Sequence, residues 1–305
     1  MHKRMYLLPF FRTFDILKKL FEHIYYRKET YFMIEARAKL KEARRIVIKI
    51  GTSSLVYENG KVNLNRIQTL ARVISDLMNR EKEIVLVSSG AIGLGVTKLN
   101  LERKPDTVAG RQAVAAVGQV NLMRSYGRAF EDYGYVSGQV LLTKNIIDGE
   151  ESRHNALNTF NALLDMHIVP IVNENDTVAV DEIKFGDNDN LSSIVSRLIG
   201  ADLLIILTDI DGFYSQNPNE HPDAVLYHNI SDLSEKIEEA AGGAGSKLGT
   251  GGMLTKVHAS RIAAEHGTNS VIANGSNPEI IYDILNGEDV GTLFIATKEP
   301  TEGDI

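Results

Sequence analysis

Short apolar runs alternate with helical stripes along most of this chain. Runs rich in Val, Ile and Leu, typical of strands buried on both faces of a sheet, occupy residues 45–51, 83–90, 136–142, 168–173, 201–209, 270–275 and 291–297. Apolar residues recur at helical spacing over residues 63–81, 111–130 and 255–267. This order predicts an α/β fold, a three-layer α-β-α sandwich around a mainly parallel sheet. No repeat or Pro/Ser-rich linker interrupts it, so we expect one domain.

Polar residues follow the predicted strands at the point where each strand ends. Ligands of open α/β folds bind beyond the carboxyl ends of the strands. The segments that leave those ends carry small, hydroxyl-bearing or acidic residues: Lys49 to Ser54, Ser88 to Ala91, Glu174 to Asp176, and Thr208 with Asp209. We therefore expect a ligand site at this edge of the sheet.

Two clusters of short carboxylates and amides, "NENDTVA" (173–179) and "KFGDNDNLS" (184–192), lie close together in the sequence. A calcium-binding EF-hand loop is excluded, because Leu191, Ser192 and Leu198 occupy positions where that motif requires other residues. A solvated turn is the alternative, since Asp, Asn and Gly are common turn formers. The predicted position at the carboxyl edge favours site residues.

Two lysines stand beside glycine-rich turns. Lys49 precedes "GTSS", and Lys256 closes "GSKLGTGGMLTK" (245–256). Small residues let backbone N–H groups approach an anion, and the two lysines add positive charge. Each lysine alone could be a surface residue with a buried stem. Neither a Walker A motif nor G-x-G-x-x-G occurs, so the pair predicts a triphosphate clamp of another type.

Charge and composition exclude several classes of protein. The chain has 305 residues, a net charge of −7 and no cysteine, so disulfide frameworks and thiolate metal or catalytic sites are excluded. Beyond residue 45 the chain is strongly acidic, which argues against nucleic-acid binding. No apolar run approaches the roughly 20 residues of a membrane helix, and we expect a cytoplasmic protein. Residues 1–32 are basic and aromatic with helical spacing. They predict either an amphipathic surface helix or a misassigned start, with Met33 as the true one.

Taken together, the segments resemble the amino acid kinase family. The resemblance is collinear from about residue 44 to residue 297. It rests on "IVIKIGTSSL" (46–55), "LVSSGAIGLG" (86–95), "AAVGQ" (115–119), "VNENDTVAVDEIKFGDNDNLS" (172–192), "LTDIDGFY" (207–214), "GTGGMLTK" (249–256) and "VGTLF" (290–294). The acidic segment is typical of the branch that phosphorylates glutamate, whereas the "GTGGM" segment is shared more widely.

The resemblance implies ATP-dependent phosphorylation of the γ-carboxylate of L-glutamate to L-glutamyl 5-phosphate, the first step of proline biosynthesis. The implied catalytic residues are Lys49 and Lys256, which contact ATP phosphates, and Asp189, which holds both lysines. The implied ATP site comprises Lys49, Gly51, Thr52, Ser53, Thr208, Asp209, Thr250, Gly251, Gly252, Met253, Leu254, Thr255 and Lys256. The implied glutamate site comprises Ser89, Gly90, Ala91, Asp176 and Asn188. Mg²⁺ is expected to be carried by ATP, with no protein side chain assigned to it.

The chemistry of the residues agrees with this reaction. A carboxylate acceptor is already ionised, so no general base is needed, and what remains is positioning and charge neutralisation. The α-ammonium of a free amino acid requires acidic partners, which an N-acetylated substrate does not. Kinases of N-acetylglutamate, aspartate, carbamate or UMP remain alternatives. So do a non-catalytic glutamate or proline sensor and a scaffold recruited to membranes through residues 1–32.

We expect an N-terminal extension at 1–43, a kinase domain at 44–298 and a tail at 299–305. The C-terminal PUA domain of many bacterial relatives and the fused reductase of plant and animal enzymes are expected to be absent. The resemblance further implies proline as a feedback inhibitor, glutamyl phosphate reductase as a pathway partner and a homo-oligomer, dimer or tetramer. No nucleic acid and no membrane span are expected.

Overall fold

The computed structural model describes residues 32–57, 59–143, 149–178, 188–231, 237, 241 and 252–296. The predictions for residues 1–31 and for the tail at 299–305 lie outside the described residues. So do the predicted site residues Thr250 and Gly251.

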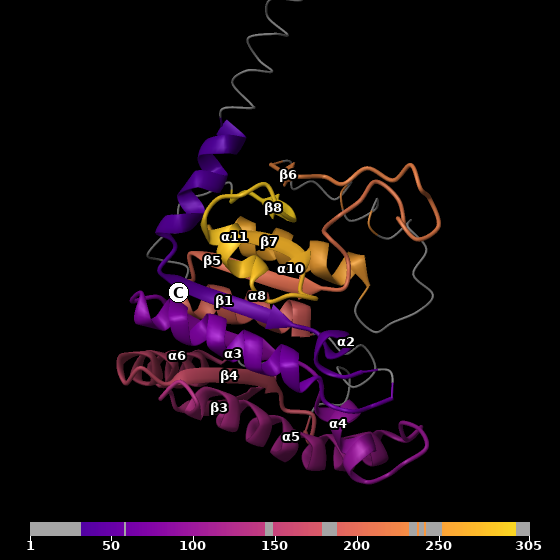
Figure 1. Cartoon of the computed structure of the whole chain (residues 1–305). Coiled ribbons are helices and arrows are strands. Elements are labelled where there is room, and N and C mark those ends of the chain that lie inside the picture. Colours follow the sequence, from indigo (N-terminus) through magenta and orange to yellow (C-terminus); the bar gives the residue numbers. More distant parts are fainter. Residues whose placement is uncertain are drawn as a thin grey trace, which may run out of the picture.

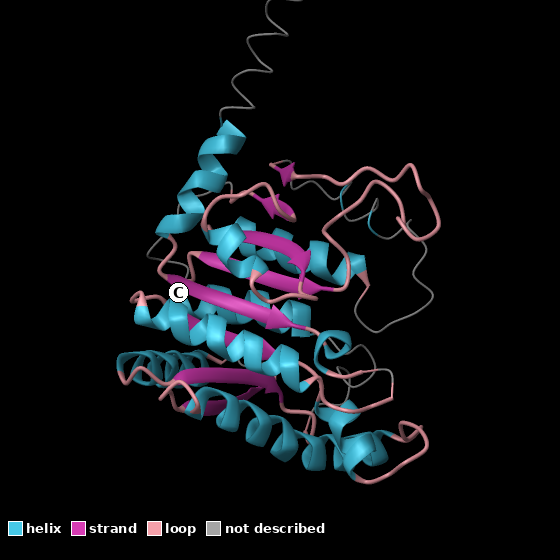
Figure 2. Ribbon diagram, in the orientation of Figure 1, coloured by secondary structure: helices cyan, strands magenta, loops and turns pink. Residues whose placement is uncertain are grey.

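An eight-stranded sheet forms the centre of the fold, in the order β3-β4-β2-β1-β5-β7-β8-β6. The strands are β1 (Arg45–Ile50), β2 (Glu83–Ser88), β3 (Ser137–Leu142), β4 (Val169–Glu174), β5 (Leu203–Thr208), β6 (Asn229–Ile230), β7 (Asn269–Asn274) and β8 (Thr292–Phe294). From β3 to β7 all neighbours are parallel, whereas β8 runs antiparallel to β7 and parallel to β6. The parallel strands therefore end at one common edge, toward which their arrowheads point in Figure 2.

Helices cover both faces of this sheet (Figure 1). They are α2 (Thr52–Leu55), α3 (Leu64–Asn79), α4 (Ala91–Lys98), α5 (Val108–Glu131), α6 (Glu150–Asp165), α8 (Asn188–Ile199), α10 (Met253–Glu265) and α11 (Ile280–Leu285), with the 3₁₀ helix η1 (Leu40–Glu42). Side chains alternate along each strand. In β1, Ile46 and Ile48 join the core under η1, α3, α5 and α11, while Val47 joins the core under α6, α8 and α10. The predicted three-layer sandwich is confirmed.

Helix α4 is held against α5 by direct contact between their backbones. A Cβ at Gly118 of α5 would lie 1.6 Å from the carbonyl oxygen of Ala91, and one at Gly95 of α4 would lie 2.0 Å from the carbonyl oxygen of Val114. Only glycine fits at these crossings. Gly90, which precedes α4, has φ +109°, a left-handed conformation that also favours glycine. The start of α4 is thereby fixed at the carboxyl edge of the sheet, directly after β2.

The segment preceding β1 packs against the same domain. Residues 32–39 are helical, and Met33, Ala36 and Leu40 contact the core. The guanidinium of Arg37, which is buried, donates hydrogen bonds to the carbonyl oxygens of His228, Glu288, Val290 and Gly291. This part of the predicted N-terminal extension therefore ties the chain to the loops around β6 and β8.

The observed elements differ from the predicted ones at identifiable places. The run at 291–297 forms a strand only over β8 and is antiparallel to its neighbour β7. Helices α4, α6, α8 and α11 were not predicted. The α8 helix begins inside the acidic cluster, where short polar residues conceal a helical repeat of Leu191, Val195 and Leu198. No helix of the described residues is long and apolar enough to cross a membrane.

Candidate active site

A buried carboxylate joins two lysines from different elements at the carboxyl edge. Asp189, in the first turn of α8, lies 2.5 Å from the Nζ of Lys49 through Oδ1 and 3.1 Å from the Nζ of Lys256 through Oδ2. Lys49 comes from β1 and Lys256 from α10. The hydroxyl of Thr255 also donates to Oδ2, at 2.7 Å. The structure thus brings together the three residues predicted to be catalytic, and we call Lys49, Asp189 and Lys256 the lysine clamp.

The lysine clamp is almost fully removed from solvent, with 5 % of Lys49, 1 % of Asp189 and 6 % of Lys256 exposed. Burial raises the pKa of Asp189, but the two ammonium groups and the hydrogen bonds from Lys49 and Thr255 outweigh burial and lower that pKa to about 2. Burial lowers the pKa of Lys256, and Asp189 opposes that shift. With Asp189 ionised and both lysines protonated, the clamp carries one net positive charge in a poorly solvated place. An anionic ligand is the natural complement of such a charge.

Helix α10 presents its first turn beside the clamp. Gly252 caps the helix in an extended conformation and has no side chain that could accept from the first N–H groups. Such N–H groups and the helix dipole favour phosphate. A Cβ at Gly51 would approach the Nζ of Lys49 to 3.6 Å, so the glycine keeps space open at that ammonium. These residues fit the phosphate groups of a nucleotide.

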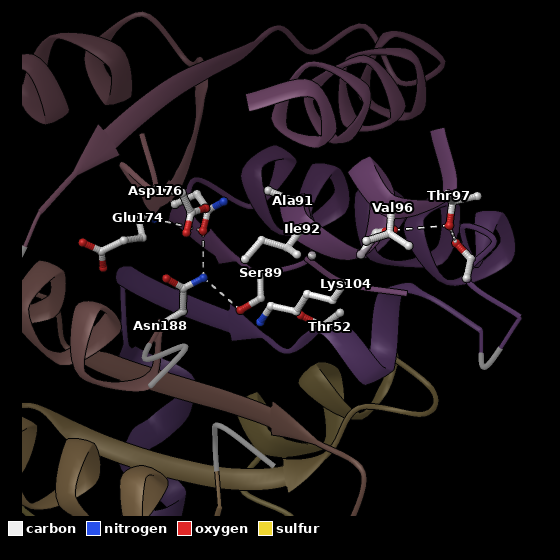
Figure 3. A pocket seen from close by; sticks show the side chains of 14 residues that line it. Thr52, Ser89, Ala91, Ile92, Val96, Thr97, Lys104, Glu174, Asp176 and Asn188 are labelled. Atoms are coloured by element: carbon white, nitrogen blue, oxygen red, sulfur yellow. Dashed lines mark hydrogen bonds between the residues drawn. The ribbon is translucent and has the colours of Figure 1, made fainter. Parts of the chain in front are cut away.

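A pocket of about 420 Å³ opens next to the clamp (Figure 3). All five residues predicted to bind substrate line it: Ser89, Gly90, Ala91, Asp176 and Asn188. The other lining residues are Thr52, Gly60, Ile92, Gly93, Val96, Thr97, Lys104, Asn173 and Glu174. Ligand pockets commonly measure about 300–1,000 Å³, and this one suits a small polar molecule.

A chain of amide hydrogen bonds holds the floor of the pocket. Asn188 donates to the hydroxyl of Ser89 and to the Oδ1 of Asn173, both at 2.8 Å. Asn173 in turn donates to Gln119 at 2.9 Å, and Gln119 donates to Gln139 at 3.0 Å. Figure 3 shows the side chains of Asn188 and Ser89 turned toward each other. These hydrogen bonds fix the start of α8 relative to β2, β3, β4 and α5.

Among the side chains that line the pocket, Asp176 and Lys104 carry charges that interact, and Glu174 adds a second carboxylate. Burial raises the pKa of Asp176 to about 6, and Lys104 opposes that shift. Partial burial lowers the pKa of Lys104, Arg111 lowers it further, and Asp176 raises it. The two groups therefore line the same pocket within electrostatic range of each other.

The other predicted ATP-site residues that the structure describes lie on the elements that carry the clamp or next to them. Thr208 is buried at the end of β5 and donates to Asp209 at 3.1 Å. Asp209 interacts electrostatically with Lys256. Thr52 and Ser53 are exposed in α2, and Met253 and Leu254 form the start of α10.

Sequence reasoning did not assign Gln119 or Lys104 to the site, and it included Asn173 only as the first residue of the cluster at 173–179. Asn173 and Gln119 lie inside segments quoted for the family resemblance, which could have drawn attention to them. Lys104 lies in a loop with no motif of its own, so nothing in the sequence indicated its position.

Comparison with known proteins gives a consistent result. The sequence model of the amino acid kinase family matches residues 44–274 of this chain. Glutamate 5-kinase of Clostridium perfringens is 56 % identical over 266 residues, which cover 86 % of this chain and 99 % of the relative. Glutamate 5-kinase of Listeria innocua is 53 % identical over 272 residues, covering 88 % and 99 %. Among solved structures, carbamate kinase from Giardia lamblia bound to AMP-PNP has a TM-score of 0.59 and 16 % identity, covering 84 % of this chain and 99 % of that one. The last likeness concerns the fold alone.

Proposed function

Because this chain belongs to the amino acid kinase family, we propose that it transfers the γ-phosphoryl group of ATP to the γ-carboxylate of L-glutamate. The products are L-glutamyl 5-phosphate and ADP, and the reaction is the first step of proline biosynthesis. Relatives more than half identical over nearly their whole length carry the name of this activity.

One observation in the structure carries the proposal. Consecutive residues of α8 face two different sites: Asn188 lines the pocket, and Asp189 pairs with both lysines of the clamp. An acceptor in the pocket and a phosphoryl group on the clamp are therefore neighbours. That is the arrangement required for direct transfer between two bound substrates.

The chemistry asks little of the protein beyond position and charge. An oxygen of the ionised γ-carboxylate forms a bond to the γ-phosphorus while the bond from that phosphorus to the β-phosphate oxygen breaks, and ADP takes the electron pair. No proton has to be removed from the acceptor, so the reaction needs no general base. Lys49 and Lys256 neutralise charge on the transferred group, and the N–H groups in the first turn of α10 hold phosphate oxygens. Asp189 keeps both ammonium groups in place.

Substrate choice follows from the acidic end of the pocket. Asp176 offers a carboxylate to the α-ammonium of a free amino acid. An N-acetylated substrate has no charge there, and its amide would leave the partly buried carboxylate uncompensated. Free glutamate is thus preferred to N-acetylglutamate. Aspartate, one methylene shorter, does not span from Asp176 to the clamp as well.

Trapping of the product tests the proposal directly. The protein is incubated with ATP, Mg²⁺ and hydroxylamine, and glutamate, N-acetylglutamate or aspartate is offered separately. Hydroxylamine converts an acyl phosphate to a hydroxamate. We expect hydroxamate from glutamate alone. Hydroxamate from another acid would keep the kinase and change its substrate. If no acid gives a product and calorimetry still detects bound glutamate, the protein is a sensor instead.

Several finer features remain part of the proposal. Mg²⁺ is bound through the phosphates of ATP. Proline acts as a feedback inhibitor, and a glutamyl phosphate reductase consumes the product. The protein works in the cytoplasm as a homo-oligomer. The acyl phosphate hydrolyses readily in water, which supports prompt use by a second enzyme.

A further inference from the structure

The loop between α4 and α5 returns over the pocket and brings a lysine to it. Lys104 lines the pocket with Ser89, Asp176 and Asn188, and in Figure 3 its side chain extends into the cavity. Pro105 follows it, which favours an extended backbone at Lys104. The two residues flanking this pair, Arg103 and Asp106, form an ion pair with each other at 3.2 Å on the exposed side of the loop.

Lys104 is available to a ligand. Among the described residues, the structure gives it no ion-pair partner within 4 Å, although Asp176 acts on it electrostatically. Arg111, on the first turns of α5, adds positive charge nearby. The pocket therefore contains a cation that the transfer chemistry at the clamp does not use.

A charge balance of the acceptor gives this cation a role. Free glutamate carries an α-ammonium and two carboxylates. The γ-carboxylate must lie toward the clamp to receive the phosphoryl group, and the α-ammonium is complemented by Asp176. The α-carboxylate then lies beside the ammonium at the same end of the pocket, where it requires a cation or N–H donors.

Building on the proposed function, we infer that Lys104 binds the α-carboxylate of the amino-acid acceptor and so selects acceptors that carry a free α-carboxylate. Lys104 and Asp176 together then recognise the zwitterionic end of the substrate. The alternating charges also place the γ-carboxylate at the far end, toward Asn188 and the clamp. Lys104 is in this view a specificity residue that contacts substrate and takes no part in phosphoryl transfer.

The test compares L-glutamate with its α-amide, which retains the γ-carboxylate and the α-ammonium but lacks the α-carboxylate. Both are assayed by hydroxamate formation with wild type, Lys104→Met and Lys104→Arg. Arg103→Met is the matched control, because it removes the same charge from the adjacent, outward-facing position. We choose about pH 8, where Asp176 stays ionised even without Lys104.

Loss of one charge-assisted contact at this partly exposed position should raise the KM for glutamate about 10-fold in Lys104→Met. The kcat stays within about 3-fold of wild type, since the clamp is unchanged. The KM for the α-amide does not change, so the preference for glutamate over its amide disappears. Lys104→Arg restores most of the preference, and Arg103→Met leaves it intact.

Two results overturn the inference: a KM for glutamate altered less than about 3-fold, or equal losses with glutamate and its amide. Calorimetric titration with glutamate separates this from failure of the proposed function. If wild type forms no hydroxamate but binds glutamate more tightly than Lys104→Met does, the kinase assignment fails and the role of Lys104 stands. If wild type does not bind glutamate, both fail.

Discussion

Replacing Asp189 with asparagine removes the one charge that joins the two lysines of the clamp. Asparagine has nearly the same shape, so the packing around it is preserved. Its Oδ1 accepts from one ammonium, but its NH₂ group then faces the other. The two buried ammonium groups then share one neutral acceptor at this position, and Asp209 is a remaining acidic group that acts on Lys256. Thr255, which donates to the carboxylate, also loses a charged partner.

The cost of this change follows from burial and from the pKa of the carboxyl group. That pKa falls from 3.8 to about 2 in the folded protein, which corresponds to about 2 kcal/mol of favourable interaction with the ionised form. Because the folded pKa is the lower one, this stability is present at neutral pH and is lost as the pH falls from about 4 toward 2. Breaking a buried ion pair by removing one partner costs roughly 3–5 kcal/mol.

The expected loss lies near the lower end of that second range, about 3 kcal/mol. The pKa reports only protonation of a carboxyl group that still accepts one hydrogen bond, so it gives the smaller figure. The loss does not reach about 5 kcal/mol because Lys256 can lose its proton and become neutral. Burial already lowers its pKa, and without Asp189 that pKa falls further, so a neutral amine relieves part of the strain. A neutral Lys256, however, no longer neutralises negative charge on the transferred phosphoryl group, so kcat should drop by about 10² to 10³.

Urea unfolding and steady-state turnover measure the two effects in the same preparation. Glu35→Gln is the control for stability, because it breaks an ion pair with Lys39 whose side chains are 66 % and 63 % exposed. That pair should contribute less than about 1 kcal/mol. If Asp189→Asn shifts the unfolding midpoint no more than Glu35→Gln, the buried charge does not stabilise the fold. If it unfolds more easily but turns over normally, the clamp is structural and its catalytic assignment is wrong.

Three further outcomes are expected. Lys49→Ala or Lys256→Ala should lower kcat by about 10³, measured by hydroxamate formation at saturating substrates, and near-normal turnover in both would contradict the clamp. With Asp176 at a pKa of about 6, kcat/KM for glutamate should fall as the pH drops below 6, since the neutral acid no longer attracts the α-ammonium; Asp176→Asn should abolish this dependence, and its survival would assign the titration to another group. Gly118→Ala places a Cβ 1.6 Å from the α4 backbone and should lower the unfolding free energy by about 3 kcal/mol. Gly127→Ala on the same helix meets only one atom, at 4.0 Å, and should be neutral or stabilising; equal effects would rule out the close crossing.

The centre of the sheet was predictable because its strands are buried on both faces. Such strands need continuous apolar sequence, as in Leu203 to Leu207, and that signal does not depend on the rest of the fold. Helix α8 escaped prediction because its first turn is built from functional residues. Asn188 and Asp189 are poor helix formers and suggest a turn, yet both are buried here, Asn188 against Ser89 and Asn173 and Asp189 against β1 and α10. The functional residues at the start of α8 therefore weakened the helical sequence pattern by which this helix would have been predicted.

The residues of the clamp could be predicted from the sequence, whereas one residue of the pocket, Lys104, could not. Lys49 precedes a glycine-rich turn at the end of a strand, and Lys256 follows one at the start of a helix, so the sequence itself marked both lysines. Lys104 reaches the pocket only because α4 and α5 cross closely and the loop between them folds back. That crossing depends on glycines at 95 and 118, whose spacing has no meaning until both helices are placed. Long-range packing of this kind cannot be predicted from a local sequence pattern.

The acidic cluster joins the two halves of the site through adjacent residues of one helix. Successive side chains of an α helix point about 100° apart, so Asn188 and Asp189 cannot face the same ligand. Asn188 is fixed by Ser89 and Asn173 on the acceptor side, and Asp189 by both lysines on the nucleotide side. Neither side chain can shift without disturbing the other through the rigid first turn of α8. In the proposed reaction, the distance between acceptor and phosphoryl group is therefore set by a single peptide unit, which accounts for two short polar residues at the start of this helix in place of better helix formers.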